Sequence, residues 1–214
     1  MNPATEMPRF LRSAPVRLRA ALLLAAAGLV LSGCALTRGD PTITYDLGPP
    51  AAASSDNGNP APARLPKLRV AQTDGPSWLD GNALFYRLQY AQAQRLQAYA
   101  TQRWVMSPTR LFDDRLREAV AARGTLSWFG DNSVPALKVD LLEFGQVFDS
   151  ATASEGVVRL RATVFQHGML GQQTFEARRP AASADGAGGV RALAEASDAV
   201  IAALLDWIGT LQLK

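Results

Sequence analysis

Hydrophobic residues between positions 65 and 214 follow two spacings, one with a period of two and one with a period near 3.6. The first spacing is typical of strands that bury one face, and the second of helices that bury one stripe. Alternation occupies residues 68–71, 84–90, 96–105, 125–129, 136–148, 157–166 and 172–178. Helical spacing occupies residues 107–124 and 190–211. The chain therefore predicts strands, a helix, more strands and a closing helix.

The clearest strand covers residues 157–166, where arginines at 159 and 161 alternate with inward positions. Those inward positions are Val158, Leu160, Ala162 and Val164. A turn at residues 168–171 joins this strand to residues 172–178, so the two form a hairpin. Residues 136–148 change phase after Leu141, which indicates either burial on both faces or a bulge near Gly145. Residues 84–90 alternate throughout, which places Tyr90 on the face of Leu84.

Both helices have recognisable ends. Ser107 is a predicted N-cap, Pro108 occupies the first helical position, and Gly124 supplies the stop. The apolar face of this helix carries Phe112, Leu116, Ala119 and Val120, and Asp113 and Arg117 are predicted to pair on its solvent side. The closing helix is predicted at about residues 190–211, with a stripe of Val190, Leu193, Ala194, Ser197, Val200, Ile201, Leu204 and Ile208. Residues 183–189, including the glycines at 186, 188 and 189, are predicted to be a loose loop.

This order of elements predicts an α/β fold. We expect a single-domain sandwich over residues 65–214, in which two principal helices pack on a mainly antiparallel or mixed sheet. About 150 residues are enough for one domain with its own core.

The N-terminus predicts a secreted lipoprotein. Basic residues Arg9, Arg12, Arg17 and Arg19 precede an apolar run at 20–31, which is shorter than the ~20 residues of a transmembrane helix. Leu31-Ser32-Gly33-Cys34 then resembles a lipobox. That resemblance implies removal of residues 1–33, with a diacylglyceryl group and an N-acyl chain such as palmitate on Cys34. The alternative is an ordinary secretory signal with a chance cysteine.

Residues 34–64 are predicted to be a lipidated N-terminus and flexible tether. Ala35 resembles the default residue after a lipoprotein cysteine, which implies the periplasmic side of the outer membrane. Residues 42–47 are β-like, and residues 49–64 are rich in Pro, Ala, Ser, Asn and Gly. Such a composition buries too little apolar surface to offset the entropy of ordering, so we expect a linker.

Charge and cysteine content exclude several function classes. The chain has 22 basic and 19 acidic residues, but four arginines and one glutamate fall in residues 1–33. The mature chain is therefore neutral, which removes the electrostatic basis for nucleic-acid binding. Acylation would use the only cysteine, which leaves no thiol for a disulfide, a metal or a nucleophile.

Catalytic residues are sparse, so no enzyme, metal or cofactor is expected. His167 is the only histidine and sits beside Gly168 at a strand end, where an exposed turn residue is the simpler interpretation. Asp113-Asp114 fits a solvated helix face better than a paired-carboxylate site. The glycines at 186–189 lack the Lys and Ser/Thr of a phosphate-binding loop.

Aromatic residues offer a candidate surface. Tyr86, Tyr90, Tyr99, Trp104, Trp128 and Phe129 cluster in the strand region, where they form either core or a surface for a partner or lipid. The candidates for such a surface are Tyr86, Arg87, Arg103 and Trp104. The apolar stripe of the closing helix has the same two interpretations.

Several short motifs, in order, resemble one family. They are the lipobox, Tyr45-Asp46-Leu47, Tyr86-Arg87, Arg103-Trp104 before Ser107-Pro108, and the amphipathic closing helix. Together they resemble the ABC-type transport auxiliary lipoproteins, which accompany Mce-domain lipid transport systems and include the paraquat-inducible lipoprotein. The spacer at 49–64 and the loop at 183–189 look like insertions relative to that pattern.

The resemblance implies an accessory, non-enzymatic role in moving lipid between membranes. The implied partners are an Mce-domain periplasmic protein and, through it, an inner-membrane permease and ATPase, together with self-association. Two other hypotheses stay open on the residues alone. One is a regulator of a peptidoglycan synthase, and the other is a lipid-anchored hydrolase.

Overall fold

A computed structural model describes residues 41–50 and 64–213 of the chain. The signal motif Leu31-Ser32-Gly33, Cys34 and most of the spacer lie outside these residues. The described part belongs to a unit that begins at Pro41. Its folded elements thus start well before residue 65, the domain boundary predicted from the sequence.

The centre of the fold is a seven-stranded mixed sheet. Its main path runs β1-β4-β3-β5-β6-β7, and β2 pairs with β5 beside that path. The pairs β1–β4, β2–β5 and β3–β5 are parallel, and the other pairs are antiparallel. The strands are β1 (Ile43–Tyr45), β2 (Arg69–Val70), β3 (Ala83–Leu88), β4 (Leu96–Trp104), β5 (Ala136–Phe148), β6 (Ser154–Phe165) and β7 (Met169–Pro180).

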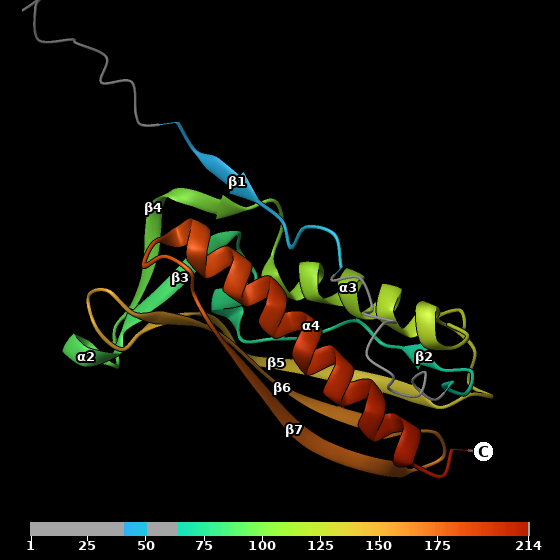
Figure 1. Ribbon diagram of the computed structural model, residues 1–214. Helices are drawn as coiled ribbons and strands as arrows, with labels where there is room; N and C mark the ends of the chain where they lie inside the picture. Colours follow the sequence, from blue (N-terminus) through green and yellow to red (C-terminus); the bar gives the residue numbers. More distant parts are fainter. Residues whose placement is uncertain (1–40, 51–63, 214) are drawn as a thin grey trace, which may run out of the picture. The chain divides into compact units, whose positions relative to one another are not determined.

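Two principal helices pack on the sheet, α3 (Pro108–Arg123) and α4 (Gly186–Thr210). Figure 1 shows α4 running along β5, β6 and β7 with α3 beside it, in agreement with the contacts between these elements. A short helix α2 (Gln89–Gln92) and a 3-10 helix η2 (Ser77–Leu79) complete the described elements. The α/β sandwich with two principal helices is confirmed.

The core lies between the two principal helices and the inward face of the sheet. All of the predicted inward residues of β6 are buried, and so is the stripe of α4 apart from the half-buried Ala194. Each large apolar side chain removed from water contributes about 1.5–3 kcal/mol. Arg159 and Arg161 lie on the opposite face, where they pair with Glu143 at 3.7 Å and Asp140 at 3.4 Å.

Helix α3 begins after Ser107 and ends before Gly124, as its sequence predicts. Asp113 and Arg117 do pair, at 2.7 Å, but the prediction of a solvent-side pair is wrong. Asp113 also accepts hydrogen bonds from the backbone N–H and hydroxyl of Thr73, each at 2.9 Å. Arg117 donates to the carbonyl of Val70 at 2.9 Å. The pair therefore ties α3 to the chain that follows β2.

Three local predictions about strands need correction. The bulge in β5 lies at Leu142, because the register with β6 shifts between Leu141 and Glu143 rather than near Gly145. Residues 125–129 contribute only a bridge between Leu126 and Leu68, because the chain turns there. Alternation ends at Leu88, and Tyr90 lies exposed on α2. The β6–β7 hairpin is confirmed, although β7 already begins at Met169.

Helix α4 begins at Gly186, so its glycines belong to the first turn rather than to a loose loop. Asp185 caps the helix by accepting a hydrogen bond from Gly188 N–H at 2.8 Å. This bond holds the pKa of the Asp185 carboxyl below its usual value. A β-carbon on Gly189 would lie 2.2 Å from Oε1 of Gln146. Glycine therefore allows this helix end to approach the sheet closely.

Candidate functional site

The segment that carries the Tyr45-Asp46-Leu47 motif is built into the folded unit. Strand β1 pairs in parallel with β4, with Tyr45 opposite Trp104. Gly48 has a φ of +64°, a conformation that favours glycine, and its N–H donates to Asp46 Oδ1 at 2.8 Å. The resulting turn places the side chain of Leu47 in the core.

Arg115 of α3 holds this turn. Its Nη1 donates to the carbonyl of Gly48 at 2.7 Å, and its Nη2 lies 3.4 Å from the carbonyls of Leu47 and Pro49. On its other side the guanidinium forms a two-point ion pair with Asp198 of α4, at 2.7 and 3.2 Å. We call Arg115, Asp198 and the carbonyls of residues 47–49 the N-terminal clamp.

The N-terminal clamp was not predicted from the sequence, because its members are far apart in the chain. Arg115 is 7% exposed and lies one residue before the buried Leu116. Asp198 directly follows Ser197, which is part of the predicted stripe of α4. A charged residue on the buried side of each helix is the signal that points to such a pair, because charges are rarely buried without a partner.

Tyr86, one of the predicted surface residues, belongs to an aromatic cluster. Its ring centroid is 4.7 Å from that of Tyr99 on β4 and 5.9 Å from that of Phe148 on β5. Its hydroxyl lies 3.5 Å from Gln97 Oε1. Arg87 next to it reaches the carbonyl of Ala93, with 3.4 Å between Nη1 and oxygen. Both side chains are half-buried and keep some surface for a partner.

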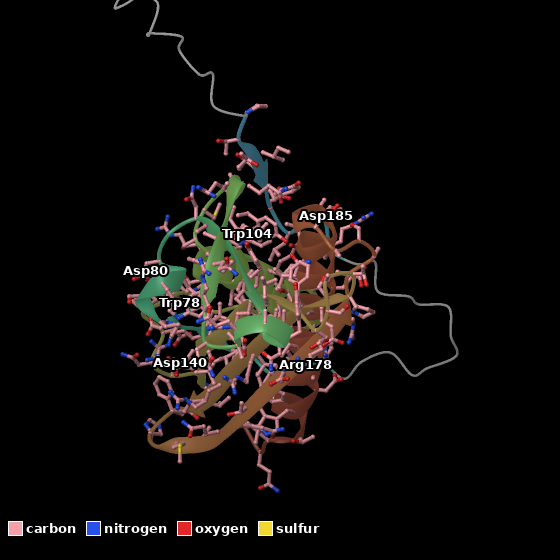
Figure 2. The ribbon with its side chains drawn as sticks, turned by 90° about the vertical axis from the view of Figure 1, so that its left-hand side faces the viewer. Trp78, Asp80, Trp104, Asp140, Arg178 and Asp185 are labelled. Carbon is pink, nitrogen blue, oxygen red and sulfur yellow. The ribbon has the colours of Figure 1, made fainter. Side chains whose placement is uncertain are left out.

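Arg103 and Trp104 do not form one surface. Trp104, which is labelled in Figure 2, is 1% exposed and packs edge-on against Phe144 with 5.6 Å between ring centroids. It is therefore a core residue, and the prediction that it belongs to a contact surface is wrong. Alternation on β4 explains this, since consecutive side chains point to opposite faces. Arg103 bonds to the carbonyls of Tyr99 and Gln102 on its own strand.

A buried polar network joins the aromatic cluster to the start of α4. Tyr99 donates its hydroxyl proton to Gln146 Oε1 at 2.8 Å. The fully buried Gln146 amide donates to Ser154 Oγ at 2.8 Å and to the carbonyl of Asp185 at 3.1 Å. Burial and the neighbouring Tyr86 raise the pKa of Tyr99 to about 12. Tyr99 therefore remains a hydrogen-bond donor at neutral pH.

The remaining candidates from the sequence do not converge. His167 is exposed in the β6–β7 turn, and Asp114 is exposed on α3 while Asp113 binds Thr73. Within residues 41–50 and 64–213 no three His, Cys, Asp or Glu side chains are placed to hold a metal ion. In the same part of the chain, none of the helices has the length and apolarity needed to cross a bilayer.

Two shallow cavities flank these elements. One, of about 380 Å³, lies between the β1 turn and α4 and is lined by Thr44, Tyr45, Asp46, Leu47, Gly48, Val105, Val190, Arg191 and Ala194. The other, of about 390 Å³, lies over α3 beside Thr73, Asp113 and Phe129. The first is mostly apolar and adjoins the point where the described chain begins.

The fold defines a class of small α/β domains that are known from solved structures. The chain resembles the crystal structure of protein XCC0632 from Xanthomonas campestris, with 22% identity and a TM-score of 0.62 over 70% of this chain and 87% of that one. It also resembles an uncharacterized protein, with 16% identity and a TM-score of 0.60 over 79% of this chain and 99% of that one. At these identities the likeness concerns the fold alone.

The family follows from the sequence match. Residues 45–204, well over half of the chain, match the model of the ABC-type transport auxiliary lipoprotein component. The chain belongs to this family, which confirms the resemblance seen in its motifs. No curated protein is similar enough in sequence to count as a match. Membership suggests a transport accessory rather than an enzyme, at an envelope location.

Proposed function

We propose that this protein is a lipid-anchored periplasmic accessory subunit of an Mce-type intermembrane lipid transporter, and that it acts by binding and positioning. Family membership is the observation that carries the proposal, because the family is defined as an auxiliary lipoprotein of ABC transport. The partners are an Mce-domain protein and, through it, a permease and ATPase in the inner membrane.

Cys34 is the proposed anchor, with its acyl chains in the inner leaflet of the outer membrane. Only seven residue steps separate Cys34 from Pro41, where the described fold begins. A fully extended chain of that length spans at most ~25 Å. The tether is thus shorter than residues 34–64, because residues 41–50 are part of the described fold.

The N-terminal clamp supports a positioning role. A flexible tether alone would let the domain sample all orientations around its anchor. Fixing residues 47–49 to both principal helices joins the tether to a rigid part of the domain. A partner would then meet the domain at a defined height above the membrane.

The test is photo-crosslinking in living cells with the full-length lipoprotein. A photoreactive residue replaces the exposed Tyr90 or Val105 in turn, and Cys34→Ala provides the unanchored control. Capture of an Mce-domain protein by the anchored chain, with much weaker capture by the control, is the expected result. Capture of a peptidoglycan synthase alone would overturn the proposal in favour of envelope regulation. Capture of no transport component from either position would also overturn it.

A further inference from the structure

Four of the seven exposed large apolar side chains in the described part of the chain come from one end of the molecule. Trp128 and Phe129 are 70% and 69% exposed in the loop between α3 and β5, and Met169 is 70% exposed at the start of β7. Leu170 follows Met169 and is also exposed. We call these four residues the apolar end.

Hydrogen bonds and strand pairing place the α3–β5 loop beside the β6–β7 turn. Gln166 in the β6–β7 turn donates to the carbonyl of Ser133 at 2.8 Å. Arg69 on β2 pairs with Ala136, which pairs with Phe165, which in turn pairs with Met169. Adjacent strands are ~4.8 Å apart, so this row spans ~15 Å. Arg69 also donates to the carbonyl of Phe129, with 3.1 Å between Nη1 and oxygen.

The loop that presents Trp128 and Phe129 is braced from inside. Asp131 accepts hydrogen bonds from the hydroxyls of Ser127 and Ser133 and forms an ion pair with Lys67 at 3.0 Å. These bonds hold the pKa of the Asp131 carboxyl well below its usual value. The loop that carries the two exposed aromatic side chains therefore has a defined structure, in which the ring of Trp128 lies over Gly130.

Basic residues outnumber acidic ones beside the apolar end. Residues 64–70 contribute Arg64, Lys67 and Arg69, while the cavity over α3 that Phe129 lines also carries Arg110, Arg117, Asp113 and Asp114. The carboxylate of Asp131 is buried and already paired with Lys67. Segments that bind the interface of an anionic bilayer typically combine exposed aromatic and apolar residues with Lys and Arg. The apolar end and its neighbours have this composition.

We propose that the apolar end inserts into the headgroup region of a phospholipid bilayer that contains anionic lipid. Four exposed apolar side chains on two loops and an excess of basic residues beside them favour a lipid surface over a protein partner, whose contacts centre on packed pockets with a polar rim. The inference rests on the proposed membrane attachment, but it does not depend on which transport partner is bound.

With the tether as one attachment point and the apolar end as a second, the orientation of the domain relative to the membrane would be fixed. The apolar end lies at the Ala136 end of β5, while the β3–β4–β1 side joins the sheet at Gln146, ten residues farther along β5. Ten residues of strand correspond to ~33 Å. The tether and the apolar end are thus two separated points of attachment.

The experiment uses the acylated protein with vesicles of phosphatidylethanolamine and phosphatidylglycerol that carry brominated acyl chains, which quench nearby tryptophan. Wild type is compared with Trp128→Phe and with the matched control Trp78→Phe, since Trp78 packs against Phe85 away from this end. We expect Trp128→Phe to lose most of the quenching and Trp78→Phe to retain it. Phe129→Glu should reduce quenching several-fold, because it adds negative charge at an exposed position.

Equal quenching of wild type and Trp128→Phe would overturn the proposal. Protection of Trp128 only after addition of a purified Mce-domain protein would also overturn it, because the end would then bind protein. Vesicle co-flotation tests the anchor separately. Flotation without Trp128 quenching removes the lipid contact alone, whereas loss of flotation counts against Cys34 acylation.

Discussion

Among single residues, Arg115 joins three parts of the chain that are distant in sequence: the turn after β1, α3 and α4. A buried guanidinium is costly to desolvate, and its hydrogen bonds repay that cost only while all partners are present. Asp131 plays a comparable local part, since one carboxylate organises the whole loop that carries Trp128.

Arg115→Ala is expected to destabilise the protein by about 3 kcal/mol, because a buried ion pair loses one partner and three carbonyls lose a donor. Chemical denaturation measures this loss, and proteolysis within residues 41–50 should accelerate. The matched control is Arg110→Ala on the exposed side of α3, where a change within about 0.5 kcal/mol is expected. Equal effects of the two substitutions would contradict the N-terminal clamp.

Asp131→Asn tests the contacts of Asp131 with Ser127, Ser133 and Lys67 through the pH dependence of stability. The folded-state pKa of Asp131 is depressed, so its stabilising contribution is complete above the unfolded pKa near ~3.9 and is lost as pH falls toward the folded pKa. Wild type should exceed the variant in stability at pH 7, and the difference should shrink below about pH 4. Denaturation at several pH values measures it. A difference that stays constant down to pH 2 would count against the assignment.

At the scale of elements, α4 makes two kinds of contact with the sheet. Its apolar stripe covers the sheet, while its glycine-rich first turn packs against polar side chains of β4 and β5. A β-carbon on Gly186 would lie 1.6 Å from Oε1 of Gln102, and one on Gly189 would meet Gln146. The lack of side chains in this turn is thus a packing requirement.

Gly189→Ala should destabilise the protein by about 1–3 kcal/mol, because overpacking outweighs the better helix propensity of alanine. Gly209→Ala in the last turn of the same helix is the control, since nothing lies within 4 Å of a β-carbon there. It should be neutral or stabilising by up to about 1 kcal/mol. Thermal unfolding of both variants measures the contrast, and a stabilised Gly189→Ala protein would refute close packing at this site.

For the whole molecule, the folded unit includes residues that composition assigns to a tether. A chain that starts at Leu65 lacks Leu47 and the carbonyls that Arg115 binds, whereas a chain that starts at Pro41 keeps both. We expect the shorter chain to be less stable by about 3 kcal/mol or more, since it loses buried apolar surface and leaves a buried cation with fewer partners. Urea denaturation of the two chains measures this, and coincident midpoints would disprove it.

Elements that bury one face can be predicted from the sequence, because burial of one face leaves a periodic pattern of apolar residues. The β6–β7 hairpin and the stripe of α4 each bury one face, so their alternation and helical spacing are strong. The start of α4 depends on β4 and β5, which approach it from elsewhere in the chain, and no local pattern records that approach. The motif Tyr45-Asp46-Leu47 lies within the family match, but the sequence assigns it to a tether, because the contact of Leu47 with Arg115 spans 68 residues.

The N-terminal clamp also constrains the order in which the chain folds. Leu47 and Arg115 are 68 residues apart, and Arg115 and Asp198 are 83 apart, so the complete N-terminal clamp forms only once α3 and α4 are both in place. We expect the backbone amides of residues 43–48 to be the last to gain protection in pulsed hydrogen exchange during refolding. Early protection of these amides would show the reverse order. Late docking would leave the residues beside Cys34 accessible to the enzymes of export and acylation until the rest of the domain has formed.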